Sequence, residues 1–386
     1  DHELDDKKLP PVQPGSGYYT ATAFADRAIE FLQQHQAEHA DKPFLMYLAF
    51  TTPHFPLQAP KQDIAKYAGK FDEGWDVCRQ RRWERMTRMG LIHCALSARD
   101  PKTIPSWNTK PEVLEKEIGP GEVEHAVAWD SLSDEQKKFQ SVKMSIHAAM
   151  VDRNDQEMGR VIEQIKAMGR FDNTVILFVS DNGASAEQLI RGDRNDRSAE
   201  PGSGKSFLCL GPGWSTASNT PFRLHKSWVH EGGIASPLVV HWPAGIKARG
   251  ELRHTPCHFV DVAPTLVELA GGKIEPLWNG LTPPPMPGKS LAPALPGDAD
   301  LHRDHLYFHH MTNKALRMGD WKIVCAGSAS PWELYNLATD RCESDDQAAR
   351  QPDRVQQMAA VWQKQEDQCL KDAGDEKKTG KKPKKQ

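Results

Sequence analysis

The stretch Thr174-Val-Ile-Leu-Phe-Val179, followed by Ser180-Asp181-Asn182-Gly183, gives the strongest indication of the fold. A continuous apolar run that ends in turn residues predicts a buried central strand of an α/β sheet. Ligands of open α/β sheets bind at the carboxyl ends of the strands. We therefore expect Asp181 and Asn182 to present a carboxylate and an amide oxygen at a site. This pair suits a hard cation such as Ca²⁺ or Mg²⁺, although the same residues also form simple tight turns.

The composition indicates a soluble globular protein with no general drive toward nucleic acid or membranes. The chain has 386 residues, enough for one large domain with an appendage or for two domains. Its net charge of −3 gives no drive toward nucleic acid or membranes, and no apolar run approaches the ~20 residues that cross a bilayer. The seven cysteines are scattered without C-x-x-C spacing, which argues against a zinc site and a complete disulfide framework. The oligomeric state is left open.

Helical and strand periodicities alternate through the first 275 residues. Ser133 and Gln136 form a capping-box signature at the start of a long apolar stripe. The patterns predict helices at about Thr20–Glu38, Asp134–Met168 and Pro264–Ala270, and strands at Phe44–Phe50, Thr174–Val179 and Pro237–Trp242.

The remainder of the chain divides by composition. Residues 70–130 are basic and tryptophan-containing, and we expect an irregular excursion there. Residues 276–300 are rich in proline and predict a linker. Residues 301–370 predict a small antiparallel sheet, with strands at His305–His309, Ala315–Ala326 and Trp332–Leu337, and a helix at Arg354–Leu370. The Lys-rich residues 371–386 predict a disordered tail.

Two further segments carry residue types suited to chemistry. His54 lies between Pro53 and Pro56 just after a predicted strand, and an imidazole held there suits general acid–base catalysis. A packed or surface histidine is the alternative. The segment Thr220–Ile234 contains Arg223, His225, Lys226 and His230, followed by Gly232-Gly233, which permits close backbone approach. It suits an anionic substrate, with a solvated basic loop as the alternative.

In order and spacing, these segments resemble the sulfatase family, within the alkaline-phosphatase-like superfamily, and bacterial arylsulfatases in particular. The resemblance covers nearly the whole chain except the lysine tail. It is carried by Pro43–Pro60, Ala148–Asp152, Val179–Ala184, Cys209–Trp214, Thr220–Ile234, His258–Thr265, Trp321-Lys322 and Trp332–Leu337. The implied fold is an alkaline-phosphatase-like α/β/α sandwich, incomplete at the N-terminus, with the small C-terminal α+β subdomain. Residues 1–275 would belong to the catalytic domain.

The resemblance also implies roles for single residues. Asp181 and Asn182 match two ligands of the family's active-site Ca²⁺, which we expect in preference to Mg²⁺. Lys226 matches a lysine that grips the sulfate, and His54 matches a histidine that contacts the sulfate and assists departure of the alcohol. The implied substrate is a sulfate-ester small molecule or a sulfated carbohydrate. Many bacterial members are exported, so a periplasmic or extracellular location is expected.

The chain departs from the family at the nucleophile. Sulfatases use a formylglycine made from the Cys or Ser of a C/S-x-P-x-R motif, and no cysteine or serine of this sequence has that context. The motif lies in the amino-terminal third of the family, so we expect a longer parent protein that supplies it. The chain alone is expected not to hydrolyse 4-nitrophenyl sulfate. The alternatives are a phosphodiesterase or phosphonate hydrolase of the same superfamily, and a non-catalytic binding protein on that scaffold.

Overall fold

The computed structural model describes residues 2–373 except 14, 193, 278, 281, 282, 284 and 285. The chain forms two compact units that alternate along the sequence. The first unit contains residues 1–78, 101–174 and 185–215, and the second contains residues 79–100, 175–184 and 216–386. Two helices, α3 (Gly74–Arg88) and α6 (Pro212–Ser218), belong in part to each unit.

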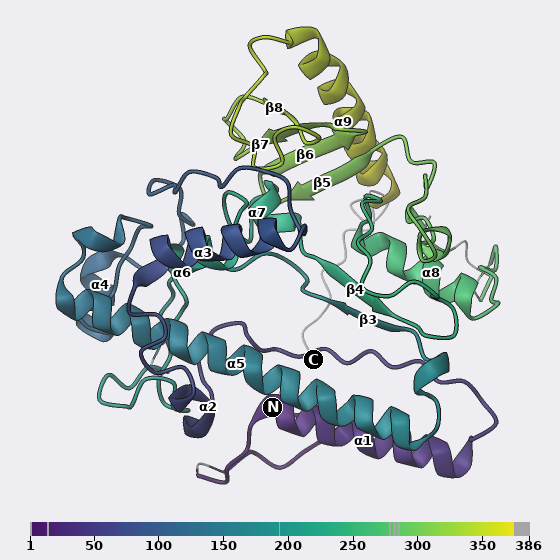
Figure 1. The fold of residues 1–386 in the computed structure, drawn as a ribbon, viewed down its shortest axis with the longest axis horizontal. Helices are drawn as coiled ribbons and strands as arrows, with labels where there is room; N and C mark the ends of the chain where they lie inside the picture. The colour runs from purple at the N-terminus through teal and green to yellow at the C-terminus, as the bar shows by residue number, and fades with distance from the viewer. Residues whose placement is uncertain are drawn as a thin grey trace. The chain divides into compact units, whose positions relative to one another are not determined.

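Two long helices organise the first unit. Helix α1 (Thr20–Glu38) and helix α5 (Asp134–Ala167) confirm two predicted helices, and they lie side by side (Figure 1). The Ser133 side chain accepts from the Gln136 N–H, and the Gln136 side chain accepts from the Ser133 N–H, so the predicted capping box is present. The smaller elements of this unit are β1 (Glu3–Leu4), β2 (Lys7–Lys8), α2 (Lys61–Ala65), α4 (Pro111–Glu117) and the 3₁₀ turns Trp129–Ser131 and Phe171–Asn173.

The segment 44–50 is extended but forms no strand, so that prediction is wrong. Phe44, Met46 and Leu48 pack against the core between α1 and α5. The alternate side chains of Leu45 and Tyr47 are 78% and 92% exposed. The apolar alternation of a strand is therefore real, but a strand also needs a hydrogen-bonding neighbour. The described part of the chain supplies none to this segment.

The segment 70–130 is more ordered than predicted. It contains α4 and helix α3, whose first turn carries Asp76 and whose last turn carries Arg85 and Arg88. In the first unit, the indole rings of Trp75, Trp129 and Trp214 meet edge to face, with centroids 4.7–5.7 Å apart. Aromatic burial of this kind fixes the segment even though its apolar residues are sparse.

In the second unit, strand β3 (Ile176–Val179) pairs with strand β4 (Leu238–His241) in antiparallel register, with Val179 opposite Leu238. The sequence places both strands correctly, but it is wrong about their burial. Phe178 and Val239 are 51% and 55% exposed, and β3 has no second neighbour among the described residues. The strand therefore lies in a two-stranded ribbon instead of at the centre of a covered sheet.

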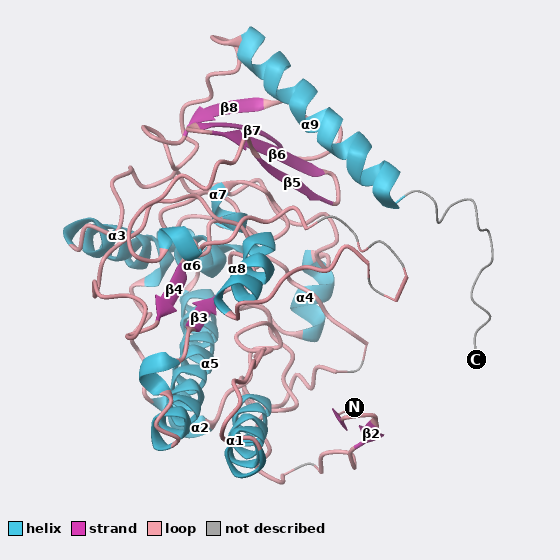
Figure 2. Cartoon of the chain, turned by 90° about the vertical axis from the view of Figure 1, so that its right-hand side faces the viewer, coloured by secondary structure: helices cyan, strands magenta, loops and turns pink. Residues whose placement is uncertain are grey.

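The C-terminal part of this unit is a four-stranded antiparallel sheet, which confirms the antiparallel sheet predicted there. Its strands are β5 (Leu306–His310), β6 (Asn313–Met318), β7 (Trp321–Cys325) and β8 (Glu333–Asn336), in that spatial order. Helix α9 (Pro352–Ala373) covers one face of the sheet (Figure 2). Met358 and Trp362 of α9 pack there against Leu316, Ile323 and Leu334.

The structure describes only part of the predicted linker and of the predicted tail. Helix α9 continues to Ala373, so the first residues of the predicted tail are helical, and residues 374–386 lie outside the described residues. The predicted linker, residues 276–300, is preceded by the 3₁₀ turn Phe259–Asp261 and by helix α8 (Val262–Leu269). It contains a 3₁₀ turn at Ala292–Ala294, and five of its residues lie outside the description. The domain boundaries stay predictions.

Candidate functional site

The Asp181–Asn182 turn follows directly after β3 in the second unit. The Ser180 hydroxyl donates to the Asn182 carbonyl at 3.0 Å, and the Asn182 amide nitrogen donates to the Gly183 carbonyl at 2.9 Å. The side-chain nitrogen of Asn182 is thus occupied by a hydrogen bond to the backbone of the turn. The amide oxygen is the atom that remains suited to a cation. Asp181 is exposed, so its carboxylate is accessible from solvent.

Glycines fix this turn against the segment that carries Lys226. The Gly183 N–H donates to the Gly233 carbonyl at 3.0 Å, and the Gly232 N–H donates to the Arg223 carbonyl at 2.9 Å. A Cβ atom on Gly183 would lie 1.8 Å from the Gly232 carbonyl oxygen. The two backbones therefore touch, and only glycine fits the contact. The close approach predicted from the Gly232-Gly233 pair occurs here.

Lys226 is attached to the same turn through its backbone. Its N–H donates to the Ala184 carbonyl at 3.0 Å. The Asn219 side chain joins the two segments a second time: its oxygen accepts from the Ala184 N–H at 2.7 Å, and its nitrogen donates to the Leu224 carbonyl at 3.1 Å. Lys226 is far from Asp181 and Asn182 in sequence, yet the two backbone segments are bonded to one another within one compact unit.

The backbone around Lys226 is strained. Leu224 and Ser227 have φ angles of 64° and 81°, a region that side-chain-bearing residues seldom adopt. Asn219 holds the Leu224 carbonyl, and the buried Asn313 of β6 donates to the Ser227 carbonyl at 2.7 Å. Strain of this kind persists only where the surroundings impose it, and it gathers at functional sites. Two asparagine side chains thus impose the conformation that presents Lys226.

Three other basic residues of the segment belong to the framework instead. Arg223 donates to the Tyr335 hydroxyl at 2.9 Å and pairs with Glu333 at 3.2 Å. The His230 ring is buried and lies 3.2 Å from the same carboxylate. Burial raises the pKa of Glu333, but its hydrogen bonds to His230 and Tyr335 outweigh that effect and lower the pKa to about 2.

His225 is also a framework residue. Its side chain is 2% exposed, and its ring lies 6.0 Å from that of Trp228. Burial lowers its pKa to about 4, because the charged imidazolium would lose its hydration. A neutral imidazole at physiological pH adds no positive charge for an anionic substrate. Of the four basic side chains predicted to bind an anion, Lys226 remains the candidate.

His54 belongs to the first unit. The ring nitrogen Nδ1 lies 2.8 Å from the Phe55 carbonyl oxygen, and the side chain is exposed. Its loop is fixed within that unit by the Asn154 amide, which donates to the Thr52 carbonyl at 2.8 Å, and by the Leu57 N–H, which donates to Leu208. A held, solvent-accessible imidazole is consistent with the predicted role. Its meeting with Asp181, Asn182 and Lys226 stays a prediction.

The donor set fits a calcium ion by type but not by number. A carboxylate and an amide oxygen are ligands that Ca²⁺ takes, and the ion needs about six to eight of them. Within the described ranges, no group of three or more His, Cys, Asp or Glu side chains could hold a metal ion. Asp181 and Asn182 would therefore supply part of a coordination shell.

Comparison with known proteins decides the family. The sulfatase profile matches residues 2–272, and the profile of the C-terminal part of N-sulphoglucosamine sulphohydrolase matches residues 222–369. The chain belongs to the sulfatase family. An uncharacterized sulfatase of Schizosaccharomyces pombe is 31% identical over 365 residues, which cover 89% of this chain and 61% of that protein.

Other sulfatase-family relatives and a solved structure agree. An arylsulfatase of Klebsiella aerogenes is 31% identical over 290 residues, covering 72% of this chain and 56% of that protein. The structure of BT4656 in complex with its substrate D-glucosamine-2-N,6-O-disulfate has a TM-score of 0.54 at 18% identity, covering 92% of this chain and 70% of that one. The latter likeness concerns the fold, and it confirms the predicted α/β class. The chain spans about three fifths of the length of the two curated relatives.

The sequence patterns do not reveal the residues that join the Asp181 and Lys226 loops together. Asn219 stands before Thr220-Pro221 and has no motif spacing of its own. Asn313 lies between two predicted strands far along the chain. Their roles depend on which carbonyls the fold brings to them, so neither residue type nor spacing could reveal them. The strained φ angles of Leu224 and Ser227 are the structural signal that points to both.

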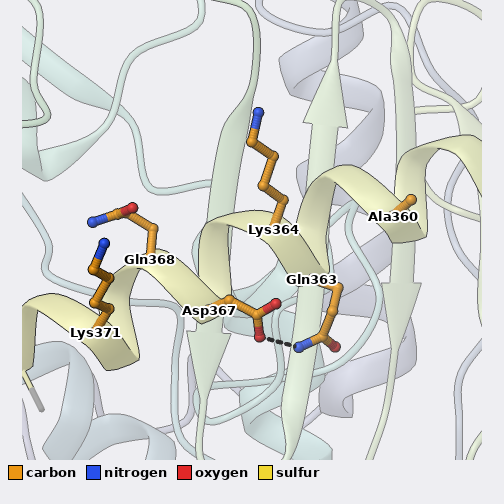
Figure 3. Close-up of a pocket in the computed structure, with 6 residues that line it drawn as sticks. All are labelled: Ala360, Gln363, Lys364, Asp367, Gln368 and Lys371. Atoms are coloured by element: carbon orange, nitrogen blue, oxygen red, sulfur yellow. Dashed lines mark hydrogen bonds between the residues drawn. The ribbon is translucent and has the colours of Figure 1, made fainter.

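A shallow depression on α9 is unrelated to this chemistry (Figure 3). Its lining comes from one helix face, where the Gln363 amide donates to the Asp367 carboxylate at 2.8 Å. Such pairs one turn apart are typical of a solvated helix surface.

None of the described helices is long and apolar enough to cross a membrane.

Proposed function

We propose that this chain is part of a sulfuric ester hydrolase, in which Asp181, Asn182 and Lys226 bind a cation and the sulfate group of the substrate. The junction between the two loops supports this proposal most directly, because the Lys226 N–H bonds to the Ala184 carbonyl at 3.0 Å. A bond between backbones keeps the lysine close to the two oxygen donors. The proposed substrates are aryl sulfates or sulfated carbohydrates, in line with the arylsulfatase relative.

Each residue has a distinct role in this proposal. The Lys226 ammonium group offsets negative charge on the sulfate oxygens, which grows more important as the ester bond breaks. The His54 imidazole donates a proton to the departing alcohol oxygen. Asp181 and Asn182 hold Ca²⁺, which when bound would withdraw charge from the sulfate oxygens. A formylglycine nucleophile would come from the parent protein, because no residue of this sequence has the required motif.

Calcium binding tests the proposed cation site and does not require the protein to hydrolyse a substrate. Isothermal titration of the full chain with CaCl₂ is expected to give weak binding, with a Kd on the order of 10⁻⁴–10⁻³ M, because the ligand shell is incomplete. Asp181→Ala is expected to weaken binding at least about tenfold, since it removes the charged ligand. Asn182→Ala should have a smaller effect in the same direction.

The matched control is Asp172→Ala, which removes an exposed carboxylate in a 3₁₀ turn of the first unit. It should bind calcium like the wild type. If the wild type and Asp181→Ala bound calcium with equal affinity, Asp181 would not be a calcium ligand. A competing titration with sulfate and phosphate would distinguish the sulfatase proposal from the phosphoester alternatives, through the preferred anion.

A further inference from the structure

Two cysteine thiols meet in the second unit, outside the proposed sulfate site. The side chains of Cys94 and Cys342 are hydrogen-bonded to one another. The Cys342 sulfur also lies 2.6 Å from the Ala95 carbonyl oxygen, although 247 positions separate these two residues in sequence. Cys342 is fully buried, whereas Cys94 is partly exposed. Both thiols are free in this structure.

The surroundings make the two sulfurs chemically unequal. The hydrogen bond with Cys342 lowers the pKa of Cys94, and the positive charge of Arg341 adds to that effect. The same hydrogen bond, together with burial, raises the pKa of Cys342. The thiolate is the reactive form of cysteine. Cys94 is therefore the thiol that solvent reagents reach and that ionises first, and Cys342 is placed to react second.

We propose that Cys94 and Cys342 form an oxidisable pair that closes into an intrachain disulfide by exchange with a small-molecule disulfide such as oxidised glutathione. The Cys94 thiolate attacks one sulfur of the reagent, forms a mixed disulfide and releases one glutathione thiolate. Cys342 then loses its proton to solvent and attacks the Cys94 sulfur, which releases the second glutathione. The two cysteines lose two electrons, and the reagent is reduced to two thiols.

The pair is placed where a covalent link would stabilise the framework of Lys226. On one side, the Trp83 indole N–H donates a hydrogen bond to the Cys94 carbonyl at 2.8 Å. The nearby Ser97 N–H donates to the Pro221 carbonyl at 3.1 Å. On the other side, Cys342 lies next to Glu343, whose carboxylate accepts from the Glu231 N–H at 2.8 Å. The disulfide would thus join the two segments that flank residues 220–234.

Mass mapping of the full chain tests the pair directly. The protein is incubated with oxidised glutathione, and its remaining thiols are blocked with iodoacetamide before digestion with trypsin without reductant. We expect Met89–Arg99, which contains Cys94, to be recovered linked to Cys342–Arg350. Recovery of both peptides with blocked thiols would overturn the proposal. So would a stable mixed disulfide of Cys94 with glutathione.

Thermal unfolding provides the second readout. Oxidation is expected to raise the Tm of the wild type by about 5–10 °C, because a bridge over so long a loop restricts the unfolded chain. The shift should vanish in Cys94→Ser and persist in Cys369→Ser, which changes an exposed cysteine of α9. An equal shift in Cys94→Ser would contradict the assignment. Neither readout depends on the proposed sulfatase activity.

Discussion

Replacing Lys322 with methionine is expected to cost about 3–5 kcal/mol of unfolding free energy, because it removes the buried cation that two buried carboxylates share. The Lys322 ammonium lies 2.9 Å from Glu231 and 2.8 Å from Glu343, and all three side chains are buried. Burial alone would lower the pKa of Lys322, but the two carboxylates hold it above its ordinary value. Urea unfolding at pH 7 measures the loss.

The pH dependence separates this mechanism from a simple packing defect. Burial raises the pKa of Glu231, and Lys322 with Arg341 outweighs that effect and lowers it below its ordinary value of 4.5. Without Lys322, burial should raise the folded-state pKa above 4.5, so that stability falls as pH rises through this range. The deficit of Lys322→Met should therefore be smaller at pH 4 than at pH 7. A deficit independent of pH would contradict the buried-charge account.

The matched control is Lys364→Met, which changes an exposed lysine on α9. Its unfolding free energy should stay within about 0.5 kcal/mol of the wild type. A loss as large as that of Lys322→Met would indicate that methionine itself, and not the missing buried charge, causes the effect.

Replacing Gly183 with alanine is expected to separate the loop of Asp181 and Asn182 from the loop of Lys226. The new Cβ would lie 1.8 Å from the Gly232 carbonyl oxygen and 3.0 Å from the Asn219 side-chain oxygen. Because the nearer atom belongs to the backbone, the two segments must move apart. The bond from the Gly183 N–H to the Gly233 carbonyl should break. We expect a loss of about 1–3 kcal/mol in unfolding free energy and a calcium affinity reduced at least about tenfold.

Gly297→Ala is the control for Gly183→Ala, because no heavy atom lies within 4 Å of its added Cβ. Urea unfolding and calcium titration of both variants give the comparison. Wild-type stability in Gly183→Ala would show that the two backbones are not in contact. Reduced stability with unchanged calcium affinity would instead show that the two backbones are in contact but that calcium does not bind at this turn.

The sequence predicts local structure well wherever the signal is complete within one segment. The capping box at Ser133 and the long apolar stripe give the start of α5 at the correct residue. The alternating apolar residues after His305 give the C-terminal sheet, although β6 and β7 were expected as one continuous stretch. In these cases the periodicity and the end signals belong to the same element.

Prediction fails where the structure depends on a distant partner. Leu45 and Tyr47 have the alternation of a strand, but pairing requires a neighbour that no local pattern can specify. Helix α3 was missed because its apolar residues are few, although Asp76 in the first turn and Arg88 in the last complement the helix dipole. Asn219 is an ordinary polar residue until the fold brings two carbonyls to its amide.

In the candidate site, too, the sequence identifies some residues from local patterns and misses the roles that depend on distant partners. The sequence identifies Asp181, Asn182 and Lys226 by residue type and by resemblance, and the structure bonds their backbone segments together. It does not reveal that Arg223 and His230 serve the framework, because their carboxylate partner, Glu333, comes from an element far along the chain.

A crystal structure of this chain grown with calcium and sulfate tests the central claim most directly. We predict a cation about 2.3–2.6 Å from the Asp181 carboxylate and the Asn182 amide oxygen, with a sulfate ion that contacts the Lys226 ammonium. Calcium and sulfate bound away from Asp181, Asn182 and Lys226 would contradict it.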